Sequence, residues 1–268
     1  NLLKMMKKIL LLIILTTTIC SMSFAQDSTA TQFAQDSTAT QEKLNKFTSE
    51  FSIATRNMFR GTGWGQSPSA IMNLTWNACP YVSLGAYGNI TTNGTKEGYG
   101  NEFNYYATFN MFAESKNRHL KAISITVDDF FYFNSNDADN NYFDYSGDKT
   151  QHFIEGRIKY DGRFDLTGAY TFYANENANV DGVYIEAGYN ITEDFYAYLG
   201  YVTDENALMF QSESGICNIG VTHQRKLKIK DFNPILRTSV IANPNYESIY
   251  DLPGVGRNPI MLVASITF

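Results

Sequence analysis

From about residue 47 to its end, the chain consists of short segments in which apolar and polar side chains alternate. In residues 103–113, one face would carry Phe103, Tyr105, Ala107, Phe109, Met111 and Ala113. The opposite face would carry Asn104, Tyr106, Thr108 and Asn110. A period of two is typical of a β-strand with one apolar and one polar surface. Since clusters of Gly, Asn, Asp and Pro separate the segments, the sequence predicts an all-β fold.

We count twelve such segments, at residues 48–58, 69–78, 81–91, 103–114, 119–133, 151–160, 163–174, 181–191, 194–204, 214–224, 233–243 and 259–268. An even number of antiparallel strands is typical of bacterial single-chain membrane barrels. The pair Asp128-Asp129 interrupts one segment, and we expect a bulge or an early strand end there.

The connections between segments alternate in length. The short ones are 79–80, 116–118, 161–162 and 192–193. The long ones are 59–68, 92–102, 134–150, 175–180, 205–213 and 244–258. Short turns at one rim and long loops at the other are typical of a transmembrane up-and-down β-barrel.

Residues 1–25 have the pattern of a secretory signal peptide. Basic Lys4, Lys7 and Lys8 precede the apolar run 9–15, and Ser23-Phe24-Ala25 forms a cleavage site. The apolar run is shorter than the roughly 20 residues of a membrane-spanning helix. We therefore expect export, followed by a flexible periplasmic tether at 26–46 and a barrel at 47–268.

The charge of the chain argues against nucleic acid as a partner. The sequence holds 21 basic and 27 acidic residues, and removal of the leader would take away three lysines and no acidic residue. An acidic chain is repelled by phosphate backbones.

The final segment alternates in the same way and ends in an aromatic residue. Ile260, Leu262, Ala264, Ile266 and Phe268 share one face. A closing strand with a C-terminal aromatic residue resembles the signal that the outer-membrane barrel assembly machinery reads, with Phe268, Ile266 and Leu262 as its residues. Because a closed barrel satisfies every backbone hydrogen bond in lipid, we predict a barrel of about twelve strands in the outer membrane.

If the apolar faces contact lipid, the other faces bring charges of both signs into the lumen. The candidates are Arg56, Glu155, Arg157, Lys159, Asp165, Glu186 and Arg237. They would form either a constriction with a transverse field or a salt-bridge network that fills the barrel. Twelve strands lie between the filled eight-stranded interior and the open pores of about sixteen strands, so both interpretations stay open.

Enzymatic and metal chemistry have little support in the sequence. Of the three histidines, only His152 is expected near the long loops, where Ser146 could reach it, but this pairing is not distinctive. In the acidic loop 134–149, the pattern Asp137-x-Asp139-x-Asn141 begins like a calcium loop, yet Tyr142 occupies the sixth position, which needs glycine, and Asp148 the twelfth, which needs glutamate. We expect no catalytic residue, no cofactor and no bound metal.

The opening strand and loop resemble a known family. Residues Thr55-Arg56-Asn57-Met58-Phe59-Arg60-Gly61, followed by Gln66 and Pro68, are similar to the start of the TorF family. In that family an aromatic-x-Arg-Gly turn follows the first strand. Thr55-Arg56-Asn57 departs from the Ser-Asp-Tyr of that pattern, and the resemblance covers only about 25 residues. It implies an outer-membrane barrel proposed to be a porin, with no catalytic residues to carry over.

These observations favour a porin-like channel for small polar solutes or ions, held in outer-membrane lipid. The alternative is a closed structural, adhesion or receptor barrel that acts through its extracellular loops. A lipid-modifying barrel enzyme is a distant third.

Overall fold

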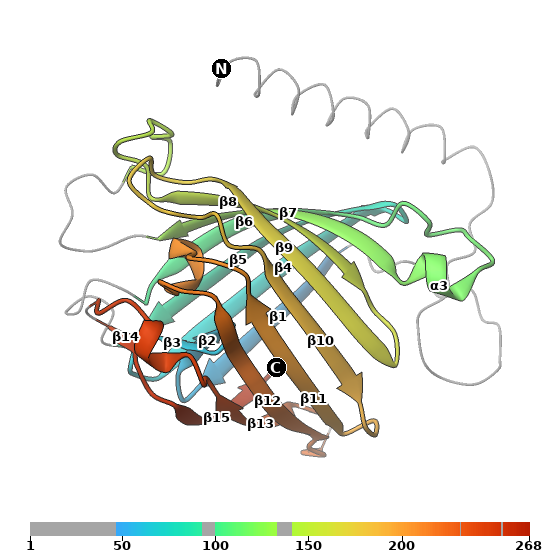
Figure 1. Cartoon of the computed structure of the whole chain (residues 1–268). Coiled ribbons are helices and arrows are strands. Elements are labelled where there is room, and N and C mark those ends of the chain that lie inside the picture. The colour runs from blue at the N-terminus through green and yellow to red at the C-terminus, as the bar shows by residue number, and fades with distance from the viewer. Residues whose placement is uncertain (1–46, 93–99, 133–140, 231, 253) are drawn as a thin grey trace.

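The protein, studied as a computed structural model, is a closed antiparallel barrel of twelve strands (Figure 1). The structure describes residues 47–92, 100–132, 141–230, 232–252 and 254–268, so the expected signal peptide and tether lie outside the described residues. The barrel strands are β1 (Phe47–Ala54), β4 (Ser69–Cys79), β5 (Val82–Thr91), β6 (Glu102–Phe109), β7 (Ile123–Tyr132), β8 (His152–Tyr160), β9 (Phe164–Tyr173), β10 (Tyr184–Asn190), β11 (Phe195–Val202), β12 (Gly215–Lys226), β13 (Ile235–Ala242) and β15 (Ile260–Thr267). The predicted fold class and strand number are confirmed.

Each barrel strand pairs with its neighbours in chain order, and β15 returns to β1. The short-turn rim carries the tight connections β4–β5, β8–β9 and β10–β11, together with the longer connections β6–β7 and β12–β13. The opposite rim, which we call the long-loop rim, carries the connections β1–β4, β5–β6, β7–β8, β9–β10, β11–β12 and β13–β15. Across the described residues, no helix is both long and apolar enough to span a membrane.

The side chains divide between the two faces as the alternation predicts. In β9, Phe164, Leu166 and Phe172 are exposed on the outside. Asp165 and Thr171 are buried on the inside. An apolar exterior around a polar lumen is the arrangement of a barrel that has lipid as its solvent.

A second, smaller sheet lies inside the barrel at the long-loop rim. It consists of β2 (Asn57–Phe59), β3 (Thr62–Trp64) and β14 (Val255–Gly256), in the order β14-β3-β2. The first predicted strand, 48–58, therefore ends early at Ala54. Residues 57–64, which we call the plug hairpin, fold into the lumen instead of forming an outer loop.

The tip of the plug hairpin is a two-residue turn. Arg60 and Gly61 have φ values of 48° and 82°. Positive φ at both central residues is the geometry of a type I′ turn, which suits the twist of a tight hairpin. A Cβ atom on Gly61 would lie 1.8 Å from the carbonyl oxygen of Cys217 on β12, so glycine lets the tip reach the far wall.

Two local expectations were wrong. The turn predicted at 116–118 is part of a longer connection, because β6 ends at Phe109 and the helical turn α3 (Arg118–Lys121) precedes β7. Asn117 caps α3 by accepting a hydrogen bond from the backbone N–H of His119. Asp128 and Asp129 remain in regular register with both neighbouring strands, because each carboxylate finds polar partners.

The plug hairpin gives the first testable prediction. Gly61→Ala should destabilise the barrel by about 1–3 kcal/mol, since the methyl group overlaps the β12 backbone and the φ angle is strained. Thermal denaturation of the refolded protein, followed as heat-modifiable migration on a gel, measures the change. Gly63→Ala is the control, because its nearest neighbours, Met261, Gly256 and Gln66, would lie 3.5–3.8 Å from the added Cβ, which is ordinary van der Waals contact. Equal stability of the two variants would contradict the packing described for Gly61.

Candidate functional site

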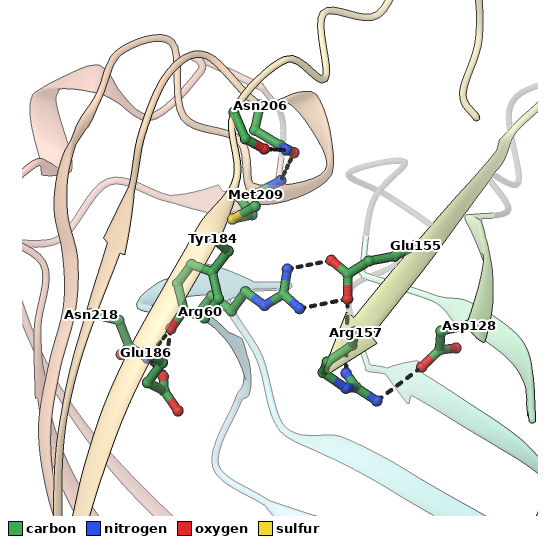
Figure 2. Close-up of polar contacts among 10 residues, drawn as sticks. Arg60, Asp128, Glu155, Arg157, Tyr184, Glu186, Asn206, Met209 and Asn218 are labelled. Atoms are coloured by element: carbon green, nitrogen blue, oxygen red, sulfur yellow. Dashed lines mark hydrogen bonds and ion pairs between the residues drawn. The ribbon is translucent and has the colours of Figure 1, made fainter. Parts of the chain in front are cut away.

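The plug hairpin is held by an ion pair across the lumen. Arg60 donates from Nη1 to Glu155 Oε2 at 2.5 Å and from Nη2 to Glu155 Oε1 at 2.6 Å. The Arg60 side chain is 8% exposed and that of Glu155 is 0% exposed. Figure 2 shows the guanidinium facing the carboxylate, with β8 supplying Glu155. This bidentate pair anchors the hairpin tip to the wall.

Arg60 is also in contact with aromatic rings. Its guanidinium lies 4.4 Å from the centre of the Tyr184 ring and 4.7 Å from that of Phe59. The Tyr184 hydroxyl donates to Glu186, and Asn218 donates to the same carboxylate at 2.8 Å (Figure 2). A delocalised cation stacks well on such faces, so the site suits arginine better than lysine.

The Glu155 carboxylate is shared with a second cation. Arg157 Nη1 lies 3.9 Å from Glu155 Oε1, and Arg157 Nη2 lies 3.5 Å from Asp128 Oδ2. These four side chains alternate in charge across β7, β8 and the plug hairpin (Figure 2). Burial of a charge is costly without such compensation, so the network lets the lumen hold ionised groups.

Above this network the long-loop end of the lumen is packed like a protein interior. Trp64 packs against Tyr132 and Phe210 with tilted rings, at centroid distances of 4.7 and 4.5 Å. The buried apolar members of this cluster are Trp64, Phe130, Tyr132, Leu208, Phe210, Ile249 and Val255. They come from the hairpin, the barrel wall and two long loops, β11–β12 and β13–β15. These residues are at most 8% exposed, so the cluster closes the part of the lumen that it occupies.

On the short-turn side of the plug hairpin the lumen is hollow. Two cavities of about 410 Å³ each share Ser52, Asn57, Met58 and Ile71 in their walls. A further cavity of about 280 Å³ continues from the first to the turn at Glu193. We call this space the chamber. It is a polar vestibule that leads to the short-turn rim.

Tyrosine rings line the chamber by lying over glycines of the neighbouring strand. A Cβ atom on Gly188 would lie 1.9 Å from the Tyr196 hydroxyl, and one on Gly220 would lie 2.2 Å from the Tyr198 ring. Glycine therefore leaves room for each ring to lie flat along the wall. The rings take up little of the lumen, which keeps the chamber open.

The predicted lumen residues all point inward or to the rim, but they do not form one constriction. Glu155 and Arg157 belong to the network that holds the plug hairpin. Lys159 pairs with Asp161 at 3.3 Å, and Asp165 accepts from the N–H of Gly162 at 2.8 Å, both at the short-turn rim. The predicted lumen charges are therefore divided among three places.

The remaining three predicted residues line the chamber: Arg56, Glu186 and Arg237. Arg56 lies 3.5 Å from the Gln66 side-chain oxygen, and Arg237 donates to Thr267 at 3.2 Å. Among the described residues, neither arginine has a carboxylate partner. They give this side of the chamber a positive character.

Arg60 is a central lumen residue that the sequence pattern did not identify as one. Arg60 was assigned to a turn, although it supplies the buried cation opposite Glu155. Its only local signal was the Arg-Gly pair, which predicts a turn but not its direction. Glu102 and Asp128, both buried on the chamber side, were also missed.

Another cluster of polar side chains lies outside the lumen, on the outer face of β7 and β8 near the long-loop rim. His152 is fully buried, with Nδ1 2.7 Å from Asp129 and Nε2 2.6 Å from the carbonyl oxygen of Tyr142. Tyr145 stacks on the imidazole at 4.0 Å and donates to Asp129 at 2.7 Å. Burial and the nearby Asp129 raise the pKa of the Tyr142 and Tyr145 hydroxyls, which therefore stay protonated. The cluster fastens loop residues 141–150 to the barrel exterior.

The contacts of His152 and its loop concern two interpretations of the sequence, a Ser146–His152 pair and a calcium loop. The Ser146 hydroxyl donates to Asp144, while both His152 nitrogens have other partners, so the two side chains do not form a pair. The first half of the calcium-like loop lies outside the described residues. Within the described ranges, no group of three or more metal-ligating side chains occurs.

Comparison with known proteins adds little beyond the architecture. No family model matches the chain, and no curated protein sequence matches it. One similar solved structure is the COG4313 outer membrane channel from Pseudomonas putida F1, with a TM-score of 0.41, 10% identity and coverage of 82% of this chain and 93% of that chain. Another is Wzi from Escherichia coli, described as a carbohydrate-binding β-barrel involved in group 1 capsule assembly, with a TM-score of 0.34, 10% identity and coverage of 83% of this chain and 56% of that chain. Neither likeness bears on the activity of this chain, and the resemblance to the TorF family rests on the residues quoted for it.

The ion pair that holds the plug hairpin can be tested by stability. Arg60→Ala should cost about 3–5 kcal/mol, because it leaves Glu155 buried without a partner. Lys159→Ala is the control, since the exposed Lys159–Asp161 pair at the rim should contribute about 0–1 kcal/mol. Denaturant titration in detergent micelles measures both, and similar losses would contradict the anchoring role of Arg60.

The outer-face cluster predicts a change in protease sensitivity. His152→Leu should free loop residues 141–150, because Asp129 and the Tyr142 carbonyl lose their shared partner. Chymotrypsin should then cleave at Tyr142, Phe143 or Tyr145 much faster than in the unaltered protein. His223→Leu, at the opposite rim, should leave the cleavage rate unchanged. If chymotrypsin cleaves the loop equally slowly in both variants, His152 does not hold the loop to the barrel exterior.

Proposed function

We propose that this chain is an exported outer-membrane channel for small polar solutes or ions, closed in the described state by its plug hairpin. The observation that carries the proposal is the polar chamber directly beneath the packed hairpin. A barrel needed only as a scaffold gains nothing from a polar hollow, which leaves its lumen unpacked. The proposal assigns no catalytic step.

The contacts that close the lumen are of a kind that can be broken and remade. The hairpin tip depends on one bidentate ion pair, and among the described residues its side-chain hydrogen bonds to the surrounding loops are long, including one of 3.5 Å from the Gln211 amide to the Thr62 hydroxyl. Asn243 donates to the carbonyl of Gly61 at 3.3 Å, and Thr62 donates to that of Met209 at 3.3 Å. Residues 57–64 are joined covalently to the wall at both ends, so displacement would move them without releasing them. We infer that passage through the barrel requires this displacement.

The chamber favours anions on the side where Arg56 and Arg237 lie. Both side chains border the same cavity, and Glu186 is the acidic residue on its wall. Because Glu186 already accepts hydrogen bonds from Tyr184 and Asn218, its charge is partly satisfied. A solute with a carboxylate or phosphate group would meet two available guanidinium groups here.

Single-channel conductance of the refolded protein in a planar bilayer tests the proposal. The unaltered protein should be mostly closed, whereas Arg60→Ala should spend far more time in discrete open steps, because the hairpin loses its anchor. Heat-modifiable migration confirms that each protein is folded. If both proteins are folded and silent, the channel proposal is wrong.

Ion selectivity tests the role of the chamber. In the Arg60→Ala background, Arg56→Ala with Arg237→Ala should shift the reversal potential in a salt gradient toward cation preference. Lys159→Ala should have little effect, since its charge is paired at the rim. An unchanged reversal potential in the double variant would remove these arginines from the conduction path.

The packing of the long-loop end also supports a second candidate function. A barrel closed by seven buried apolar side chains could serve as a rigid support for its outer loops, in a structural, adhesion or receptor role. On this interpretation Arg60→Ala lowers stability without producing conductance. The same bilayer experiment therefore separates the two functions.

Assembly of the barrel would use its last strand. Leu262, Ile266 and Phe268 lie on the outer face, with Leu262 75% and Phe268 44% exposed. Phe268 stacks on Phe51 and Phe232, at 6.0 and 5.5 Å. We propose that this exposed aromatic end is what the barrel assembly machinery binds, before lipid covers it.

A further inference from the structure

The seam between the first and last strands is paired along only part of its length. The register joins Ser52–Ala54 of β1 to Ser265–Thr267 of β15, with further backbone bonds from Thr55 to Ala264 and between Phe51 and Phe268. Beyond Thr55 the chain leaves the wall and enters the lumen as β2. Residues 260–263 of β15 therefore have β13 on one side and no barrel strand on the other.

The unpaired edge presents backbone hydrogen-bonding groups. The backbone groups of Ala264 and Phe268 form hydrogen bonds with Thr55 and Phe51, on the β1 side of the strand. Every second residue of a strand directs its N–H and C=O groups to the same side, so those of Ile260 and Leu262 face the β1 side as well. Among the described residues, no hydrogen bond from this edge to another segment is present. Ile260 and Leu262 are 65% and 75% exposed on the apolar outer face. Unpaired backbone groups at such a position are costly in lipid, so a partner for them is expected.

The chain itself holds a segment in the correct register. If β1 continued in a straight line, Asn57 would lie opposite Leu262 and Phe59 opposite Ile260. These residues already form an extended strand, β2, and no proline interrupts residues 55–59. The alternation of β1 would place Asn57 and Phe59 on the outer face. The sequence pattern alone also predicts a first strand that runs to residue 58.

We propose that residues 55–59 have two positions: the plug position in the lumen, and a wall position that extends β1 along the free edge of β15. In the wall position, Arg60 leaves Glu155, and the backbone of β2 exchanges its bonds to β3 for bonds to β15. Residues 60–68 then form an outer loop, and the lumen above the chamber loses its hairpin. This inference rests on the proposed function, for which it supplies the opening movement.

Cysteine cross-linking tests the wall position directly. In the described state Asn57 borders the chamber, whereas Leu262 points outward, so the two lie on opposite sides of the wall. In the wall position they become direct neighbours, within the range of a disulfide. Asn57→Cys with Leu262→Cys should therefore form an intramolecular disulfide under mild oxidation. Phe59→Cys with Ile260→Cys is a second pair that should give the same result if Asn57→Cys folds poorly.

Two matched pairs control the experiment. Thr55→Cys with Ala264→Cys should cross-link in both positions, because these residues are already paired. Asn57→Cys with Val240→Cys should not cross-link, since Val240 lies one strand further away, on β13. If neither test pair cross-links while the Thr55–Ala264 pair does, the wall position is wrong. A disulfide between two chains through Leu262→Cys would also overturn it, by assigning the edge to a second copy.

Conductance separates this inference from the proposed function. A cross-linked Asn57–Leu262 protein that stays open in the bilayer supports both. A cross-linked protein that is silent supports the wall position and contradicts the channel. An unaltered protein that conducts, but whose test pairs never cross-link, supports the channel and overturns the wall position.

Discussion

Lipid offers no hydrogen bonds, so a chain that spans a bilayer has to satisfy its backbone groups with one another. In this protein twelve strands meet that requirement by closing into a barrel. Closure reverses the usual arrangement of a soluble protein, because apolar side chains face outward and polar ones face inward. The charged groups of the wall are thereby enclosed in a narrow lumen, where each needs a partner.

The plug hairpin supplies one of these partners. Glu155 is fully buried on β8, and Arg60 reaches it from a turn near the start of the barrel. That turn depends on Gly61, which allows the hairpin to approach the β12 backbone closely. The same departure of the chain from the wall leaves the outer part of β15 without a neighbour. Closing the lumen and completing the wall therefore compete for one segment, residues 55–59.

Much of the fold could be predicted because its signals are local. Alternation with a period of two identifies a strand, and the apolar face identifies which side contacts lipid. Phe164, Leu166 and Phe172 point outward as expected, and Asp165 points inward. Expectations failed where a tertiary contact outweighed the pattern. The first strand ends at Ala54 although its alternation continues, and Asp129 stays in a regular strand because His152 and Tyr145 bind its carboxylate.

The sequence by itself determined the number of strands, their inner and outer faces and part of the set of charges that enter the lumen, such as Glu155, Arg157 and Glu186. These follow from the pleat of a strand and the cost of placing charge in lipid, both of which act within a few residues. Only the tertiary structure decided which charges meet and where the lumen is closed. Arg60 and Glu155 are separated by 95 positions in the chain, and the direction of the Arg60-Gly61 turn is set by contacts with β8 and β12. No local pattern carries that information, because the partners come together only when the barrel closes.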